Sequence, residues 1–373
     1  KQFEALEVTE SKRYNVNERA SKLNEIIDRD GPQELAFVSS KGVDLPEKEL
    51  VHSAIAGPNP LKLSWSSSLP INDSSWNWPN VLIEHDLLIY VLPLPLRASD
   101  LLWLEKVPVD QPSWVMVALE DSIKWPEQLQ ELQSQLPQRW ENKILRWNKT
   151  DSDLNKLLNP VRRVLSRPYK NLDITRQRLL ANLHSSWQGD LEYLRRKKFS
   201  VIQSRTQWVV AGAVFASPVP STDLLALSVA NGMMIQEMAQ IWECPWGSET
   251  LQAIAKQMAL AAIAQGVVEW SGHALFSVAK LHGSSWLAAG TMQALSAAYL
   301  TRVVGRSMAD WMALNNGVAK PDLESLKKQA PDIVRNAAKQ ERLDWTNFLK
   351  QANGWIKDKS IQPKLEATCI DAI

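Results

Sequence analysis

The stretch Trp286-Leu-Ala-Ala-Gly-Thr-Met-Gln-Ala-Leu-Ser-Ala-Ala-Tyr-Leu300 lies in the region that decides the fold of this chain. That region, residues 207–301, holds only seven charged residues in 95, where the whole-chain figure of 22% predicts about 21. Nine of the 14 glycines fall between Gly212 and Gly317, among alanine, serine, leucine, valine and methionine. Small residues at helical spacing let backbones approach closely, so this stretch predicts helices packed against helices.

Composition sets wider limits on the class of protein. A chain of 373 residues with 45% hydrophobic residues is long enough for two or three domains with real cores. A net charge of +1 argues against a nucleic-acid binder. Cys244 and Cys369 lack CxxC or metal-like spacing, which favours free thiols in a reducing compartment. The 17 tryptophans fit either many buried anchors or an interfacial protein.

The first half of the chain alternates short apolar runs with helical patterns. The apolar runs predict buried strands at 34–39, 86–92, 114–119 and 143–147. Helices are predicted at 11–30, 45–56, 99–106 and 126–136, and the polar segment 60–80 is predicted to be a loop. Strands alternating with helices indicate an α/β domain with a parallel sheet and helices on both sides.

A strand, a loop and a helix at Ser39-Ser-Lys-Gly-Val-Asp-Leu-Pro-Glu-Lys-Glu49 form the frame in which a phosphate-binding loop would lie. With Pro46 in the first turn of the helix, Pro46 replaces the last glycine of that loop and Glu47 replaces its lysine. A carboxylate there would repel a polyphosphate. Lys41 and Gly42 supply one lysine and one glycine, without a following hydroxyl, as candidate nucleotide contacts.

A second candidate nucleotide motif is Asn148-Lys-Thr-Asp151, which spells the guanine-reading NKxD signature directly after a strand. Asn148, Lys149 and Asp151 are therefore candidate nucleotide-binding residues. By strand order, however, guanine recognition should follow the preceding strand, where the sequence is Leu119-Glu-Asp-Ser122. The alternative is an ordinary polar turn that caps a helix beginning near residue 153.

Between residues 151 and 206 the chain carries 12 Lys or Arg against five acidic residues, a net charge of +7. Its densest cluster is Arg195, Arg196, Lys197 and Lys198, just before the low-charge region. Two interpretations stay open for this cluster. It is either a solvated helix face or a basic collar beside a membrane-facing element.

Two uncharged runs raise the question of membrane contact. Residues 208–220 are interrupted by Pro218 and Pro220 and are too short to span a bilayer. Residues 281–301 are long enough, but their polar side chains make a poor lipid-facing helix. Buried helices of a compact all-α domain and a re-entrant hairpin both remain open. Trp208, Pro218, Pro220 and Trp286 join the basic cluster as candidate membrane or partner contacts.

Several segments together resemble a known family: Ala216-Ser-Pro-Val-Pro-Ser-Thr-Asp-Leu-Leu-Ala-Leu227, Met233-Met-Ile-Gln-Glu-Met238, Ala288-Ala-Gly-Thr-Met-Gln-Ala-Leu-Ser-Ala-Ala-Tyr-Leu-Thr-Arg302 and Gly305. Over roughly residues 200 to 315 the chain is similar to the C-terminal helical domain of the YcjF-like family. The resemblance implies that residues 33–150 are an Era-like small GTPase domain with a P-loop fold and that the protein associates with membranes. Copies with both halves fused resemble proteins of photosynthetic bacteria. Because the nucleotide motifs depart from the family pattern, the resemblance implies a pseudo-GTPase.

These observations define the expected domain organisation, in which the last part of the chain is mainly helical. The expected parts are an N-terminal helix (1–32), a degenerate GTPase-like α/β domain (33–150), basic connecting helices (151–206), a glycine-rich low-charge helical domain (207–317) and C-terminal helices with a tail (318–373). Two exposed amphipathic helices are expected over 322–355, followed by an extended arm at 364–373.

The resulting hypothesis is a non-catalytic scaffold or assembly factor without a cofactor, bound to a membrane surface or a membrane protein complex. Its expected location is the cytoplasmic face of a membrane, with the thylakoid among the candidates. One alternative is a regulatory GTPase that uses GTP and magnesium through an altered loop. The other is a soluble homo-oligomer. The five histidines show no paired-ligand spacing, so no metal site is expected.

Overall fold

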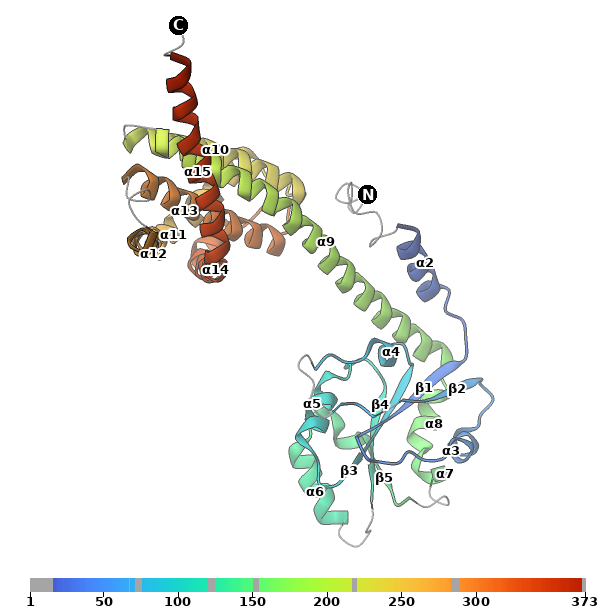
Figure 1. Cartoon of the computed structure of the whole chain (residues 1–373). Coiled ribbons are helices and arrows are strands. Elements are labelled where there is room, and N and C mark those ends of the chain that lie inside the picture. The colour runs from blue at the N-terminus through green and yellow to red at the C-terminus, as the bar shows by residue number, and fades with distance from the viewer. Residues whose placement is uncertain are drawn as a thin grey trace. The chain divides into compact units, whose positions relative to one another are not determined.

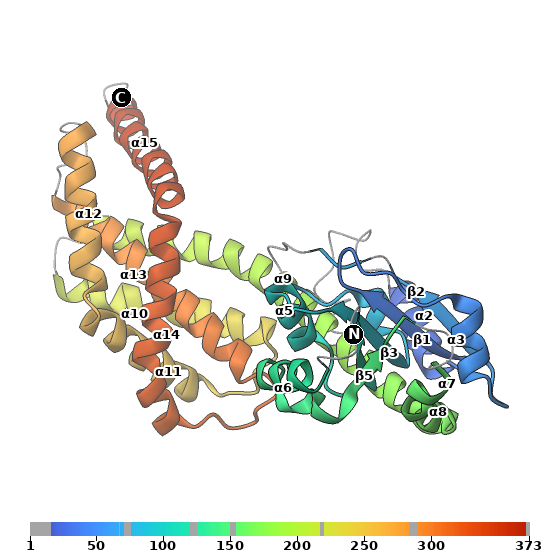
Figure 2. The ribbon, with the colours of Figure 1, turned by 90° about the horizontal axis from the view of Figure 1, so that it is seen from below.

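A computed structural model describes residues 16–66, 68–70, 76–119, 125–149, 154–216, 220–282 and 289–370. The chain divides into two compact units, and the division falls between Gln188 and Gly189. One unit is built on a five-stranded sheet and the other consists of helices (Figures 1 and 2). The predicted fold class, a parallel α/β sheet followed by an all-α region, is confirmed.

The sheet is parallel throughout, with the strand order β2-β1-β3-β4-β5. Its strands are β1 (Gln33–Ser39), β2 (Leu61–Trp65), β3 (Leu87–Pro93), β4 (Ser113–Ala118) and β5 (Ile144–Trp147). The loop expected over residues 60–80 was wrong at its start, because residues 61–65 form β2; its last residue, Asn80, begins the short helix α4 (Asn80–Ile83). β2 lies at the sheet edge and is only partly buried, so it lacks the continuous apolar run of the inner strands.

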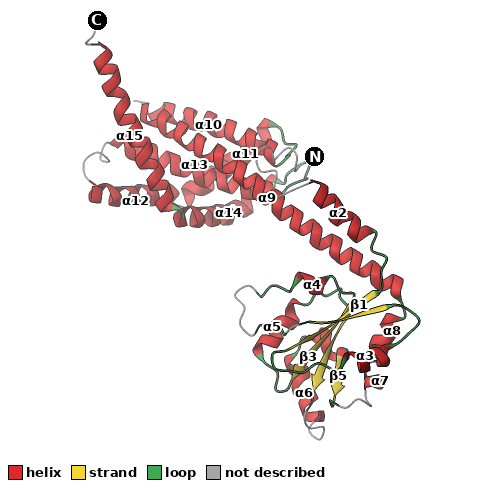
Figure 3. Ribbon diagram, turned by 45° about the vertical axis from the view of Figure 1, so that its right-hand side comes forward, coloured by secondary structure: helices red, strands yellow, loops and turns green. Residues whose placement is uncertain are grey.

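Helices cover both faces of the sheet, as predicted (Figure 3). Leu35 and Phe37 of β1 point into a core formed with α3 (Lys48–Ile55), α7 (Leu154–Leu157) and α8 (Asn159–Leu165). Ala36 and Val38 point into the opposite core, which is covered by α4, α5 (Ala98–Lys106), α6 (Trp125–Gln135) and the 3-10 helix η1 (Gln138–Lys143). Because successive residues of a strand face opposite sides, a strand between two helical layers must be apolar at almost every position.

The sheet unit also contains α2 (Val16–Ile27) and the first part of α9 (Pro168–Ala216). Arg178 of α9 donates hydrogen bonds to the carbonyls of Ile83 at 3.1 Å and His85 at 2.7 Å. Asn171 donates to the side-chain oxygen of Gln33 at 2.6 Å. These buried bonds attach the start of α9 to the amino-terminal edge of the sheet.

The helical unit is assembled around α13 (Ala289–Leu314), which packs against α10, α11, α12 and α14. The other helices are α10 (Pro220–Ile241), α11 (Ser248–Ala264), α12 (Val267–His282), α14 (Leu323–Leu343) and α15 (Trp345–Ile370). Close helix packing was expected from the small residues, and Gly305 shows it most clearly. A Cβ added at Gly305 would lie 3.2 Å from the Cε atom of Met234. The buried side chains of alanines 294, 298 and 309 are small, so neighbouring helices can approach the backbone of α13 closely.

The helix bounds bear on two further predictions. α10 begins at Pro220, as expected for a proline at a helix start, while the break predicted at Pro218 lies outside the described residues. The extended arm expected at 364–373 was wrong as far as Ile370, because α15 continues to that residue. Lysine, leucine, glutamate and alanine in this segment have high helix propensity. This propensity favours the helix even though the segment directly follows Pro363.

A buried ion pair holds α14 against α13 in the helical unit. The Arg302 guanidinium lies 2.6 Å from the Glu341 carboxylate, and the two side chains are only 8% and 2% exposed. Without Glu341, the buried Arg302 keeps the Asp344 carboxylate at 2.5 Å, but Asp344 is 41% exposed and compensates the buried charge only in part. Glu341→Ala should therefore destabilise the helical unit by about 3 kcal/mol, measured by urea unfolding followed by circular dichroism.

The matched control is Glu324→Ala, which removes an exposed partner of Lys327 on the same helix. It should cost less than about 1 kcal/mol, because surface pairs are screened by water. Equal losses in the two variants would contradict the role assigned to Glu341.

Candidate functional site

The strand order places a topological switch point between β1 and β3. The chain leaves β1 toward β2 on one side and then returns to β3 on the other side. In open parallel sheets, ligands bind outside the carboxyl ends of the strands at this point. The residues that meet there belong to the loop 40–47 after β1 and the loop 94–97 after β3.

The start of α3 corrects the expected register of the β1–α3 loop. The helix begins at Lys48, with Glu47 as its N-cap residue, so Pro46 lies before the helix and not in its first turn. Counted from Gly42, the sequence Gly42-Val-Asp-Leu-Pro-Glu-Lys-Glu49 has the spacing of G-x-x-x-x-G-K-[S/T]. Glu47 then occupies the position of the second glycine, Lys48 that of the lysine and Glu49 that of the hydroxyl residue. The spacing from Gly42 is therefore the signal in the sequence that places Lys48 at the position of the phosphate-binding lysine.

Internal contacts hold this loop closed. The Nη1 atom of Arg97 donates to the Lys41 carbonyl at 2.6 Å and approaches the Ser40 hydroxyl at 3.4 Å. The indole nitrogen of Trp65 donates to the Pro46 carbonyl at 3.1 Å. The Lys48 ammonium lies 5.3 Å from the centre of the Trp65 ring. The loop is therefore fixed by side chains from β2 and from the loop after β3, and a phosphate approaching α3 would meet the carboxylates of Glu47 and Glu49.

A buried hydrogen bond joins β3 to α5 at the switch point. Tyr90 of β3 donates its hydroxyl to Asp100 of α5 at 2.9 Å, and both residues are buried. Burial, followed by the charge of Asp100, raises the pKa of Tyr90, so its hydroxyl keeps its proton and remains a donor. This bond fixes α5 on β3 and thereby positions Arg97, which directly precedes α5.

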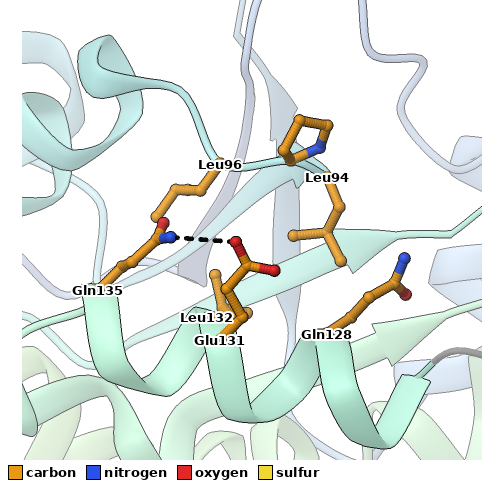
Figure 4. A pocket seen from close by; sticks show the side chains of 7 residues that line it. Leu94, Leu96, Gln128, Glu131, Leu132 and Gln135 are labelled. Atoms are coloured by element: carbon orange, nitrogen blue, oxygen red, sulfur yellow. Dashed lines mark hydrogen bonds between the residues drawn. The ribbon is translucent and has the colours of Figure 1, made fainter.

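A small pocket lies beside the loop that follows β3 (Figure 4). Its volume is about 160 Å³, and its walls are Leu94, Pro95, Leu96, Gln128, Glu131, Leu132 and Gln135. Gln135 donates to Glu131 at 3.4 Å across its floor. Ligand pockets usually enclose roughly 300–1,000 Å³. The pocket is thus too small for a nucleotide, and its one charged lining residue is an acid.

The predicted nucleotide residues follow two different strands of the sheet. Lys41 and Gly42 lie exposed in the β1–α3 loop, and Gly42 has a φ of +80°. Asn148 and Lys149 follow β5, and two strands separate β5 from β1. At the usual strand spacing this separation is about 14 Å. Asp151 lies outside the described residues.

The predicted membrane contacts have mixed positions. The Arg195 side chain is buried, and Arg196 pairs with Glu192 at 2.6 Å and Asp310 at 2.7 Å. Lys197 is exposed and Lys198 half-buried on the same helix. Trp208 stacks on the rings of Phe348 and Trp355, each with its centre 5.9 Å away. Pro220 begins α10, while Pro218 and Trp286 lie outside the described residues.

Residues 178–339 match the model of a family described as "Domain of unknown function (DUF697)". This domain is found in YcjF-like proteins, so the resemblance of the helical region is supported. The match begins in α9 and extends into α14. Searches of curated proteins and of solved structures each gave no match to the chain. The Era-like GTPase identity expected for residues 33–150 stays a prediction.

Arg97 offers a direct test of the loop geometry. Arg97→Ala removes the donor to the Lys41 carbonyl, so the loop should open more often. Amide hydrogen exchange in a peptide covering residues 40–47 should become roughly three- to tenfold faster, which is the value of one hydrogen bond. Lys41→Ala is the control, because it leaves the accepting carbonyl in place, and exchange should stay within about twofold. An unchanged rate in Arg97→Ala would show that Arg97 does not close the loop.

Proposed function

We propose that this protein is a non-catalytic scaffold or assembly factor that docks on a membrane through its helical unit. The sheet unit is a pseudo-GTPase domain in this proposal, and the helical unit supplies the docking surface. The observation that carries the proposal is an apolar tip where α11 and α12 meet, formed by Leu260, Ile263, Ala264 and Val268, with the exposed carboxylate of Glu269 beside the same turn.

The β1–α3 loop supports the absence of catalysis. Phosphoryl transfer depends on backbone donors and cations that surround the transferred phosphate. In this loop Glu47 and Glu49 flank Lys48, and Arg97 is bonded to the loop itself. A carboxylate at the start of a helix also satisfies the positive end of the helix dipole, which would otherwise attract an anion.

The α11–α12 tip has the composition of a membrane-docking element. Leu260 and Ile263 are 51% and 50% exposed, and Val268 is 37% exposed. Gly266 makes the turn with a φ of +67°, a conformation that favours glycine. Large apolar side chains grouped at one turn are costly in water and favourable at a bilayer surface.

The two helices together also have the length and composition of a bent membrane-inserted segment. Among the described residues, no single helix has the length and composition of a membrane span. Ser248–Ala264 and Val267–Ser277, bent by 55°, meet both criteria as a pair. Lys256, one turn before Leu260 on an exposed face, would lie at the level of anionic headgroups. The proposed location is the cytoplasmic face of a membrane.

Flotation with liposomes tests this proposal. The wild-type protein should float with vesicles of mixed phosphatidylglycerol and phosphatidylcholine. The double variant Leu260→Asp, Ile263→Asp should reduce the bound fraction roughly tenfold, because charged side chains cannot enter the apolar region of the interface. Both positions are exposed, so the fold should survive, as circular dichroism would verify.

The control is Leu314→Asp, which changes a 72% exposed leucine at the end of α13. It should float like the wild type. The wild type could instead fail to float and form a concentration-dependent dimer that Leu260→Asp, Ile263→Asp dissociates. This result would show that the tip contacts a second copy of the chain and not a membrane. Equal flotation of all three proteins would contradict docking through α11 and α12.

A further inference from the structure

A second pocket lies in the sheet unit at the opposite edge of the sheet from the switch point. It encloses about 360 Å³ between the amino ends of β4 and β5, the end of α8 and the start of α9. Its lining residues are Pro112, Ser113, Trp114, Lys143, Arg163, Val164, Arg167, Lys170, Asn171 and Ile174. This volume falls within the usual range of ligand pockets, roughly 300–1,000 Å³.

Four cations line this pocket, and no carboxylate does. The four are Lys143 of η1, Arg163 of α8, Arg167 of the turn between α8 and α9, and Lys170 of α9. Among the residues that the structure describes, none of the four forms an ion pair with an aspartate or glutamate. By contrast, Arg178 further along α9 approaches Asp110 at 3.9 Å. The basic pocket therefore has an uncompensated positive charge.

The other polar groups of the pocket already have partners. The Ser113 hydroxyl donates to the Gln111 carbonyl at 2.6 Å. The Asn171 amide donates to Gln33 at 2.6 Å and to the Val164 carbonyl at 2.8 Å. The cations are consequently the donors that remain for a ligand.

This concentration of cations is unfavourable in the unliganded protein. Burial, followed by the neighbouring Arg139, lowers the pKa of Lys143. Arg167 and Lys170 flank Pro168, the first residue of α9, and the first turn of α9 contains no acidic residue. Cations are disfavoured at the positive end of a helix dipole, whereas an anion there is favoured. A bound anion would relieve both effects.

The walls between the cations are apolar. Trp114, Val164 and Ile174 line the pocket, and Trp114 is only 7% exposed. A free inorganic anion would use the cations and leave these walls in contact with water. An anion joined to an apolar group would use both.

We propose that this basic pocket binds an amphiphilic phosphate, with the phosphate on Arg163, Arg167 and Lys170 and the apolar part against Trp114, Val164 and Ile174. The site lies in the sheet unit and does not depend on membrane docking by α11 and α12. A phospholipid and a soluble phosphate ester with an apolar group share this chemistry.

Isothermal titration calorimetry with the full chain tests the proposal. The probes are dihexanoyl phosphatidic acid below its micelle concentration and inorganic phosphate. Dihexanoyl phosphatidic acid should bind one per chain and at least about tenfold more tightly than phosphate, because the apolar walls contribute only to the former. Arg163→Gln, Arg167→Gln should weaken this binding by at least about tenfold, since two charge-assisted contacts are lost. Both positions are exposed, so folding should be retained.

Lys62→Gln is the matched control, because Lys62 is an exposed lysine of the same unit that pairs with Glu34 instead of lining the pocket. Its affinity should stay within about twofold of the wild type. Equal affinity for phosphate and dihexanoyl phosphatidic acid would overturn the amphiphilic ligand. Unchanged binding in Arg163→Gln, Arg167→Gln would overturn the site. Flotation with phosphatidic acid vesicles without binding of the monomeric lipid would also overturn it, as a surface effect.

Discussion

The bond from the Arg97 guanidinium to the Lys41 carbonyl determines what the sheet unit can do at its switch point. Together with the bond from Trp65 to Pro46, it fixes the backbone of the loop whose N–H groups would have to surround a phosphate. The Tyr90–Asp100 pair holds α5 on β3 and so keeps Arg97 in place. These contacts come from β2, from β3 and from the loop that precedes α5, so the β1–α3 loop is tied to the rest of the sheet unit.

The two surfaces proposed for ligand recognition lie away from the switch point. The helical unit has an apolar tip at the α11–α12 turn, and the sheet unit has a basic pocket at its amino-terminal edge. Their chemistry is complementary, because one surface suits a lipid interior and the other suits a phosphate on an apolar group. In the proposed function, both features belong to an adaptor that recognises membranes or their components, with the sheet as a rigid support.

Much of the fold could be predicted because burial on two faces forces continuous apolar runs, as in β1 and β3. β2 could not, since an edge strand with exposed Lys62 has no such run. The register of α3 was missed because Pro46 suits a first helical turn, whereas a bond from Trp65, 19 residues away, holds it outside the helix. Arg97 lies 56 residues from its acceptor, and no local pattern in the sequence indicates that contact.

The most direct test of the closed switch point is an equilibrium titration of the wild-type protein with a fluorescent GTP analogue in the presence of magnesium. A small GTPase with an intact phosphate loop serves as the positive control. We expect no saturable binding up to about 100 μM nucleotide, because Glu47 and Glu49 lie beside Lys48 and Arg97 closes the loop. Magnesium-dependent binding with a Kd of about 1 μM, weakened by Lys48→Ala, would contradict it.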